Sequence, residues 1–112
     1  MTNIILININ VATDFTVFPG ARYRSDGKFS GQEFYENLLL PKFKEVWVDD
    51  EKFLKIDFDG TFPYASSFIS EVFTRLVREF SDKDKIKSKL IFKSDNEPLL
   101  INSIMKIIDE TN

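Results

Sequence analysis

The sequence predicts an α/β fold, a single domain over residues 1–112 with a small mixed or mostly parallel sheet and three helices packed on it. Segments with strand-like alternation take turns with segments whose apolar residues recur at helical spacing, which is typical of parallel sheets with right-handed crossovers. The length of 112 residues fits one domain. The 43% hydrophobic content can supply a core, because a chain of this length buries more than half of its unfolded surface.

The first third of the chain favours extended structure and turns. Residues 3–11 predict a strand, because Ile and Val alternate with Asn in their second half. Residues 15–18 indicate a short strand or hairpin arm, and residues 19–20, Pro-Gly, a turn. Residues 22–24 then favour an extended piece, and residues 26–27, Asp-Gly, a second turn.

A helix is expected to begin at Ser30. Ser30 and Glu33 have the spacing of a capping box, in which each side chain bonds the other residue's backbone N–H. Pro41 lacks an amide donor, so the helix should stop, kink or restart near Leu40. The inner face is assigned to Phe34, Leu38 and Val46.

The middle of the chain gives the clearest signals. Residues 53–58 alternate as a strand, which we expect to be central, and residues 61–65 form a loop with Pro63. Ser66 or Ser67 should cap the next helix. Its inner face is marked by apolar residues at helical spacing: Phe68, Ile69, Val72, Phe73, Leu76, Val77 and Phe80.

The last third repeats this order. Residues 81–87 are charged and are expected to be a connection, residues 90–92 a short strand, and residues 94–96 a cap region. Pro98 falls in the first turn of a terminal helix, where proline is tolerated. The apolar face of that helix is Leu99, Leu100, Ile104, Ile107 and Ile108.

Composition excludes several function classes. With no Cys and no His, zinc sites built on those residues and His-dependent catalytic triads are ruled out, and no metal or cofactor is expected. The net charge of −3 gives no electrostatic reason to expect nucleic acid as a ligand. No apolar stretch approaches the length of a membrane span, and residues 1–10 lack the basic start of a signal peptide. A cytoplasmic location is therefore expected.

Two charged groups could carry chemistry. The loop with Arg22, Arg24 and Lys28 precedes a helix and could bind an anion. It matches no nucleotide-binding fingerprint, and the more ordinary interpretation is a connecting loop with turn glycines. Asp57 and Asp59 share a strand face and could bind a cation or act as acid and base. Alternatively, one of these carboxylates caps the following turn and the other is solvated.

The serine pair at the start of the second predicted helix has three interpretations. As a nucleophile, Ser66 or Ser67 would need a base, and the sequence places none nearby. As a helix cap, a serine needs only its hydroxyl. As a regulatory site, a serine at an exposed helix start could accept a phosphate, which adds roughly −1.5 to −2 charges.

Several blocks in this order resemble the STAS-like domain family. The resemblance covers most of residues 18–80, and its motifs are the Pro-Gly-x-Arg loop, the Ser-Gly-x-x-Phe helix start, the Asp-hydrophobic-Asp-Gly strand end and the Ser-Ser-Phe-x-x-Glu-x-Phe helix. The positions that carry it are Pro19, Gly20, Arg22, Ser30, Gly31, Phe34, Asp57, Asp59, Gly60, Ser66, Ser67, Phe68, Glu71 and Phe73.

The resemblance implies a STAS fold and a role like that of the anti-sigma factor antagonists. Those proteins bind a GHKL-type ATPase, which phosphorylates a serine after the central strand and so breaks the complex. Their motif is Asp-Ser-Ser-Gly, whereas this chain has Ala65 before the serine pair and Phe68 after it. The resemblance therefore carries over the place of a phosphoserine switch, and the flanking residues depart from the pattern.

We therefore expect a regulatory protein-binding module and not an enzyme, with another protein, such as a GHKL-type ATPase or kinase, as its partner. The expected contact surface is the loop 61–65 and the helix start after it, with Phe62, Tyr64, Ser66, Ser67 and Ser70. The two loop aromatics could instead pack inward. One alternative is an anion- or nucleotide-binding protein or enzyme that uses the arginine loop and the two aspartates. The other is a structural or oligomerisation subunit, which would expose an apolar helix face.

Overall fold

A three-stranded parallel sheet carries the fold of the computed structural model, which describes residues 3–112. The strands are β1 (Ile5–Asn10), β2 (Lys52–Asp57) and β3 (Leu90–Lys93), in the order β1-β2-β3. Both pairings are parallel. The α/β class and the central position of the second long strand are thus confirmed.

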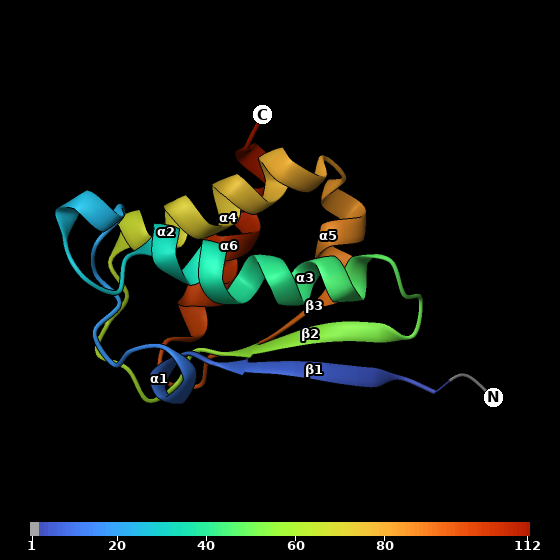
Figure 1. Cartoon of the computed structure of the whole chain (residues 1–112), viewed down its shortest axis with the longest axis horizontal. Helices are drawn as coiled ribbons and strands as arrows, with labels where there is room; N and C mark the ends of the chain where they lie inside the picture. Colours follow the sequence, from blue (N-terminus) through green and yellow to red (C-terminus); the bar gives the residue numbers. More distant parts are fainter. Residues whose placement is uncertain (1–2) are drawn as a thin grey trace.

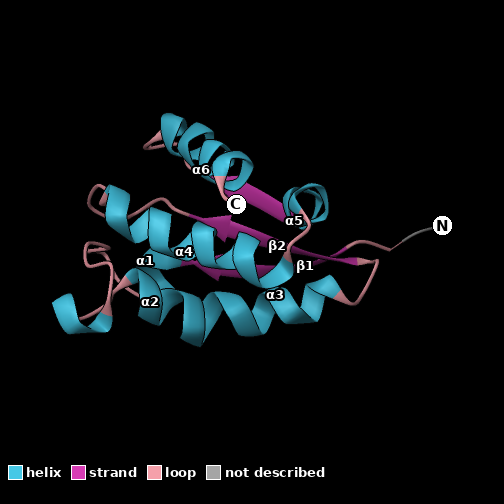
Figure 2. Cartoon of the chain, turned by 90° about the horizontal axis from the view of Figure 1, so that it is seen from above, coloured by secondary structure: helices cyan, strands magenta, loops and turns pink. Residues whose placement is uncertain are grey.

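The longer helices gather on one side of the sheet (Figure 1), and seen from above they lie over it (Figure 2). Three helical stretches, residues 31–47, 66–80 and 98–110, match the three helices predicted. Three short ones, residues 11–14, 24–26 and 83–89, were not predicted. The full set is α1 (Val11–Asp14), η1 (Arg24–Asp26), α2 (Gly31–Phe34), η2 (Tyr35–Leu39), α3 (Leu40–Trp47), α4 (Ser66–Phe80), α5 (Lys83–Lys89) and α6 (Pro98–Glu110). Within residues 3–112, none of these helices combines the length and the apolarity needed to cross a membrane.

The core lies between the sheet and the helices. Alternate residues of the strands, such as Ile9, Leu54 and Ile56, are buried, while neighbours such as Leu6 are exposed, as expected for a sheet covered on one face. The apolar face predicted for α4 is buried against them except at its end, where Phe80 is half-buried. Four residues of that face are at most 1% exposed: Phe68, Val72, Phe73 and Leu76.

The segment after β1 differs from its prediction. Residues 15–18 form no strand, because β1 passes directly into the single turn α1. Asn10 caps that turn: its side-chain oxygen accepts a hydrogen bond from the backbone N–H of Thr13 at 3.1 Å. The predicted extended piece at residues 22–24 is also wrong, since Arg24 begins the 3-10 turn η1.

Pro41 does not end its helix. The chain stays helical from Gly31 to Trp47 because a π-helical segment, η2, precedes the proline, and the N–H of Leu40 bonds to the carbonyl of Tyr35, five residues back. This wider turn accommodates a residue that cannot donate a backbone hydrogen bond. It also changes the inner face: Phe34 and Val46 are buried as predicted, Leu38 is only half-buried, and the pattern missed Tyr35, Leu39 and Phe43.

Two further predictions are corrected. Neither Ser66 nor Ser67 caps α4; both lie inside its first turn, and Ala65 occupies the capping position without a side-chain hydrogen bond. The charged connection predicted at residues 81–87 contains most of the helix α5. Asp82 caps α5 by accepting a hydrogen bond from the N–H of Lys85 at 3.1 Å, so charge alone did not indicate a loop.

Candidate functional site

The predicted contact surface lies where β2 ends and α4 begins. The chain leaves β2 at Asp57, runs through the loop 58–65 and enters α4 at Ser66. The carboxyl ends of parallel strands commonly carry binding sites, because the loops that follow them converge there. In this fold they meet at the end of the molecule opposite the start of β1 (Figure 1).

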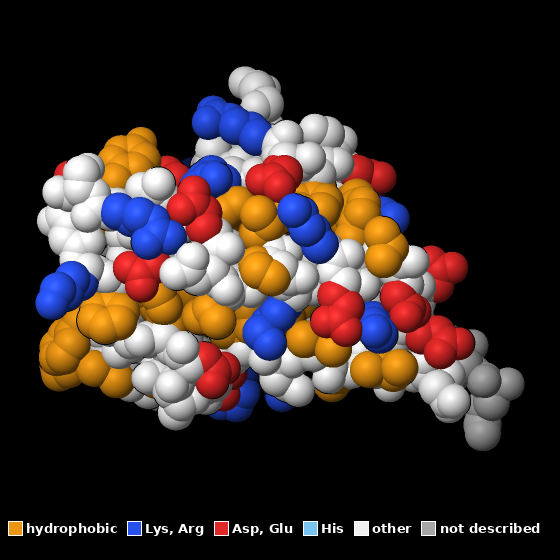
Figure 3. Space-filling model, in the orientation of Figure 1, with side chains coloured by type: hydrophobic (Ala, Val, Ile, Leu, Met, Phe, Trp, Pro, Cys, Tyr) orange, Lys and Arg blue, Asp and Glu red, His pale blue; other side chains and the backbone are white. Residues whose placement is uncertain are grey.

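Phe62 points outward and stacks on Phe18. The ring centroids are 4.6 Å apart with an interplanar angle of 10°, and the residues are 58% and 64% exposed. The backbone holds this pair in place, since the N–H of Phe62 donates to the carbonyl of Val17 at 2.8 Å. Hydrophobic side chains gather at this end of the molecule (Figure 3). Exposed aromatic rings on a fixed loop are typical anchors of protein–protein contacts.

Tyr64 points inward instead. Its hydroxyl donates a hydrogen bond to the carbonyl of Phe58 at 2.8 Å, and the two rings meet edge to face with centroids 5.5 Å apart. Burial raises the pKa of the Tyr64 hydroxyl, so it stays protonated and keeps this bond. Each of the two alternatives, outward contact and inward packing, therefore holds for one loop aromatic. Phe62 is available for contact with a partner, and Tyr64 packs inward and anchors the loop.

The three predicted serines lie near the start of α4 but differ in exposure. Ser66 is exposed, while Ser67 and Ser70 are partly buried. The Ser67 hydroxyl lies 3.4 Å from the carbonyl of Gly20, to which it donates. The first turn of α4 has neither a side-chain cap nor an acidic residue, so the positive end of the helix dipole is uncompensated beside Ser66.

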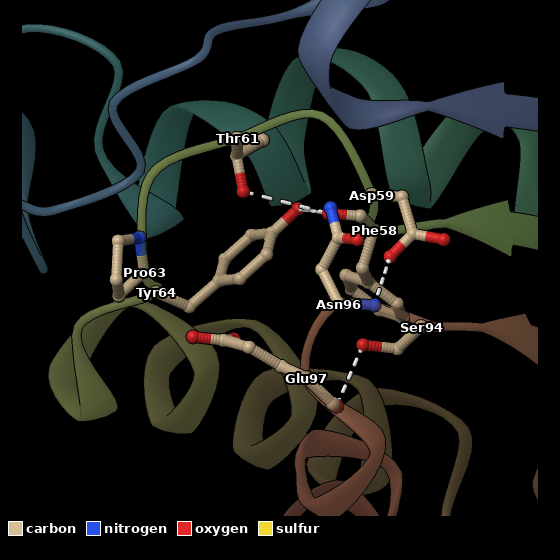
Figure 4. Close-up of a pocket in the computed structure, with 8 residues that line it drawn as sticks. All are labelled: Phe58, Asp59, Thr61, Pro63, Tyr64, Ser94, Asn96 and Glu97. Carbon is tan, nitrogen blue, oxygen red and sulfur yellow. Dashed lines mark hydrogen bonds between the residues drawn. The ribbon is translucent and has the colours of Figure 1, made fainter.

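Two small cavities flank Tyr64. The first, of about 140 Å³, lies behind the loop (Figure 4) and is lined by Phe58, Asp59, Thr61, Pro63, Tyr64, Ser94, Asn96 and Glu97. The second, of about 150 Å³, lies between α4 and α6 and includes Ser66 and Ser103. Both are smaller than the roughly 300–1,000 Å³ of ordinary small-molecule sites. A cavity of about 330 Å³ at the far end of α4 contains none of the predicted site residues.

The two aspartates organise loops. One Asp57 oxygen accepts a hydrogen bond from the N–H of Asp59 at 2.9 Å, so Asp57 caps the turn after β2. The Asp59 carboxylate accepts from the N–H of Asn96 at 2.9 Å and from Lys93 at 2.7 Å. The hydrogen bond from the Asn96 N–H, followed by that from Lys93, lowers the pKa of Asp59 to about 2. Asp57 thus caps the turn, as the capping alternative expected, but Asp59 is not solvated: it is held by backbone N–H groups and Lys93. These contacts favour a structural role over acid–base catalysis.

The arginine loop faces carboxylates. Arg24 lies 3.2 Å from Glu36, and Arg22 lies 4.0 Å from Glu71. These ion pairs tie the loop to η2 and α4, and an incoming anion would compete with them. Lys28 lies on the exposed part of the loop, and the structure does not bring it together with Asp57 or Asp59 into one site.

Sequence reasoning missed Phe18, because the segment that contains it fits a short strand. The available signal was its position directly before Pro19-Gly20, in a loop and not in a regular element. Its stacking partner lies in another loop far along the chain, and a contact of that kind leaves no periodic pattern.

Comparison with known proteins gives one family. No curated protein and no solved structure matches the chain. The family model described as the STAS-like domain of unknown function (DUF4325) matches residues 30–100, which is more than half of the chain. The matched segment includes β2, the loop with Phe62 and the whole of α4. The chain therefore belongs to the family of STAS-like domains of unknown function.

Proposed function

We propose that this STAS-like domain is a regulatory protein-binding module without catalytic activity. Its partner surface consists of Phe18 and Phe62 together with the first turn of α4, that is Ser66, Ser67 and Ser70. The observation that carries the proposal is the stacked Phe18–Phe62 pair, exposed beside an uncapped helix start.

Energetics favour a contact role for the stacked pair. Each of the two residues is more than half exposed although the core nearby holds other phenylalanines. Burial of apolar surface contributes about 25 cal/mol per Å², so covering both rings would contribute substantially to binding. The hydrogen bond from Phe62 to Val17 fixes the loop, which reduces the entropy lost on association.

Ser66 is the proposed regulatory position. The family resemblance suggests a GHKL-type ATPase or kinase as partner and a phosphate on this serine as the signal that ends the contact. Ser66 is exposed and lines the cavity between α4 and α6, so a phosphate there would place roughly −1.5 to −2 charges at the start of α4, four residues along the chain from Phe62. An acidic partner would be repelled, and an apolar one would have to desolvate the phosphate.

The proposal of a non-catalytic role rests on the state of the polar groups. Asp57 and Asp59 are engaged by backbone N–H groups, and Arg22 and Arg24 face carboxylates. An enzyme at this site would need a base within hydrogen-bond reach of a nucleophile. The contacts of Ser66 and Ser67 supply no such base among residues 3–112.

The test is capture of partners from the native host by wild type and by Phe62→Ala, followed by measurement of the dissociation constant with the purified partner. We expect identification of a GHKL-type ATPase and at least about tenfold weaker binding by Phe62→Ala, the loss typical of an aromatic anchor. Val48→Ala is the matched control, because Val48 is an 84% exposed apolar residue directly after the last residue of α3 and is not part of the partner surface. Equal binding by all three proteins would refute the partner surface.

A second arm tests the switch. Ser66→Asp should weaken the same purified complex, whereas Ser66→Ala should bind like wild type, because it removes the hydroxyl without adding charge. If Ser66→Asp binds as tightly as wild type while Phe62→Ala does not, the surface is correct and the regulatory role of Ser66 is wrong.

A further inference from the structure

The two edges of the sheet differ in their protection against pairing with another strand. The β3 edge is only four residues long and ends at Lys93. Short strands and lysines are common devices that keep an edge from pairing. The β1 edge is six residues long and contains no charged residue and no proline. The fold therefore leaves one edge open.

The backbone of β1 offers hydrogen-bonding groups at that edge. The N–H of Ile5 donates to the carbonyl of Glu51 at 2.7 Å, so Ile5 and every second residue after it face β2. The N–H and C=O groups of Leu6 and Asn8 consequently point away from the sheet. The open stretch ends at Asn10, whose N–H donates to the Asp14 carboxylate at 2.7 Å.

Apolar side chains accompany these backbone groups. Ile4, Ile5 and Leu6 are 67%, 43% and 44% exposed. Asn8 is exposed too, and its side-chain nitrogen lies 3.5 Å from the Leu6 carbonyl, a distance that leaves this oxygen available to a better donor. The helix α3 packs mainly against β2, one strand in from the β1 edge.

We propose that a second copy of this chain pairs with β1, antiparallel, so that two sheets join into one of six strands. The lack of charge favours a second copy of the chain as the binding partner of β1. Residues 3–12 carry no charged side chain, so two identical strands can pair across a two-fold axis without bringing like charges together. The partner surface lies at the other end of the molecule from residues 4–6 and stays open (Figure 1).

The experiment is measurement of molar mass by light scattering over a wide range of concentrations of the whole chain. We expect a rise from the mass of one chain, 13.1 kDa, toward twice that value. Asn8→Lys places a like charge on both copies near the axis and should raise the dimer dissociation constant about tenfold or more. Asn102→Lys makes the same change at an exposed site on α6 and should leave dimerisation unchanged.

Amide hydrogen exchange gives a second readout, because the N–H groups of Leu6 and Asn8 should become protected as the concentration rises. This readout also shows that Asn8→Lys is folded, since protection of β2 should persist in the variant. A chain that keeps the mass of one copy at every concentration overturns the proposal and leaves the edge to a strand of another protein. A dimer that Asn8→Lys does not weaken overturns it as well.

Discussion

The Asp59 carboxylate, just after the end of β2, accepts a hydrogen bond of 2.9 Å from the backbone N–H of Asn96 in the loop between β3 and α6. The same carboxylate accepts a second one, of 3.1 Å, from the N–H of Asp95. Two loops that are far apart in the sequence are thereby joined at the wall of the cavity behind Tyr64 (Figure 4). Asp59 thus acts as a structural anion that positions the loop carrying Phe62.

The first prediction follows from that role. The pKa of Asp59 lies at about 2 in the folded protein, below its value of about 3.9 in an unfolded chain. A depressed folded-state pKa contributes stability that is present above the unfolded value and is lost as the pH falls through the folded one. Wild type should therefore lose stability between about pH 4 and pH 2, and Asp59→Asn should lose less over that window. Chemical denaturation at a series of pH values measures this, and equal slopes for both proteins would contradict it.

The second prediction concerns the centre of the core. Phe73 is fully buried in α4 and meets Phe92 of β3 edge to face, with centroids 5.8 Å apart. Phe73→Ala should lower the free energy of unfolding by about 3–5 kcal/mol, because it leaves a cavity where a large ring was. Phe62→Ala is the control: its ring is already 58% exposed, so the loss should be below about 1 kcal/mol. A thermal melt of Phe73→Ala that overlays wild type would refute the packing of α4.

These elements were predictable because their signals are local and periodic. The strand at residues 53–58 and the helix α4 each repeat their apolar residues with one period over their whole length. The helix through Pro41 was not predictable in the same way. Its π-helical segment η2 precedes the proline, and the buried Tyr35, Leu39, Phe43 and Val46 follow one another at spacings of four, four and three residues. Phe34, from which the predicted face was counted, is buried too but lies off that line.

The third prediction tests the contact between α2 and α4. A Cβ on Gly31 would lie 2.7 Å from the backbone carbonyl oxygen of Phe68, and backbone cannot move aside as a flexible side chain can. Alanine usually stabilises a helix relative to glycine, but here the clash should dominate and cost about 1–3 kcal/mol. Gly20→Ala is the matched control, since a Cβ at Gly20 would have no other atom within 4 Å, and it should change stability by less than about 1 kcal/mol. Equal unfolding midpoints for the two variants would contradict the close approach.

The candidate site was predictable only in part. The position of the serine pair followed from the strand, the loop and the helix that surround it. The outward direction of Phe62 and the inward direction of Tyr64 did not, because both are aromatics in one short loop. The directions differ because the two side chains have different partners. The ring of Phe18 stacks on Phe62 at the surface, while the backbone carbonyl of Phe58 accepts a hydrogen bond from Tyr64 inside. Such non-local contacts appear only once the chain is folded.

The last prediction separates folding from binding at Ser66. The first turn of α4 contains no acidic residue and its capping position, Ala65, provides no side-chain hydrogen bond. Ser66→Asp places a negative charge at the positive end of the helix dipole and should raise the free energy of unfolding by about 0.3–1 kcal/mol at low salt. The proposed function requires the same variant to bind its partner more weakly, so stability and affinity should change in opposite directions.

Ser66→Ala controls for loss of the hydroxyl, and repetition at high salt, which screens the dipole interaction, controls for its electrostatic origin. If Ser66→Asp lost both stability and binding, the weaker binding would be explained by damage to the first turn of α4. A phosphoserine switch at this position would then have no support, because the charge would act through folding and not through the partner surface.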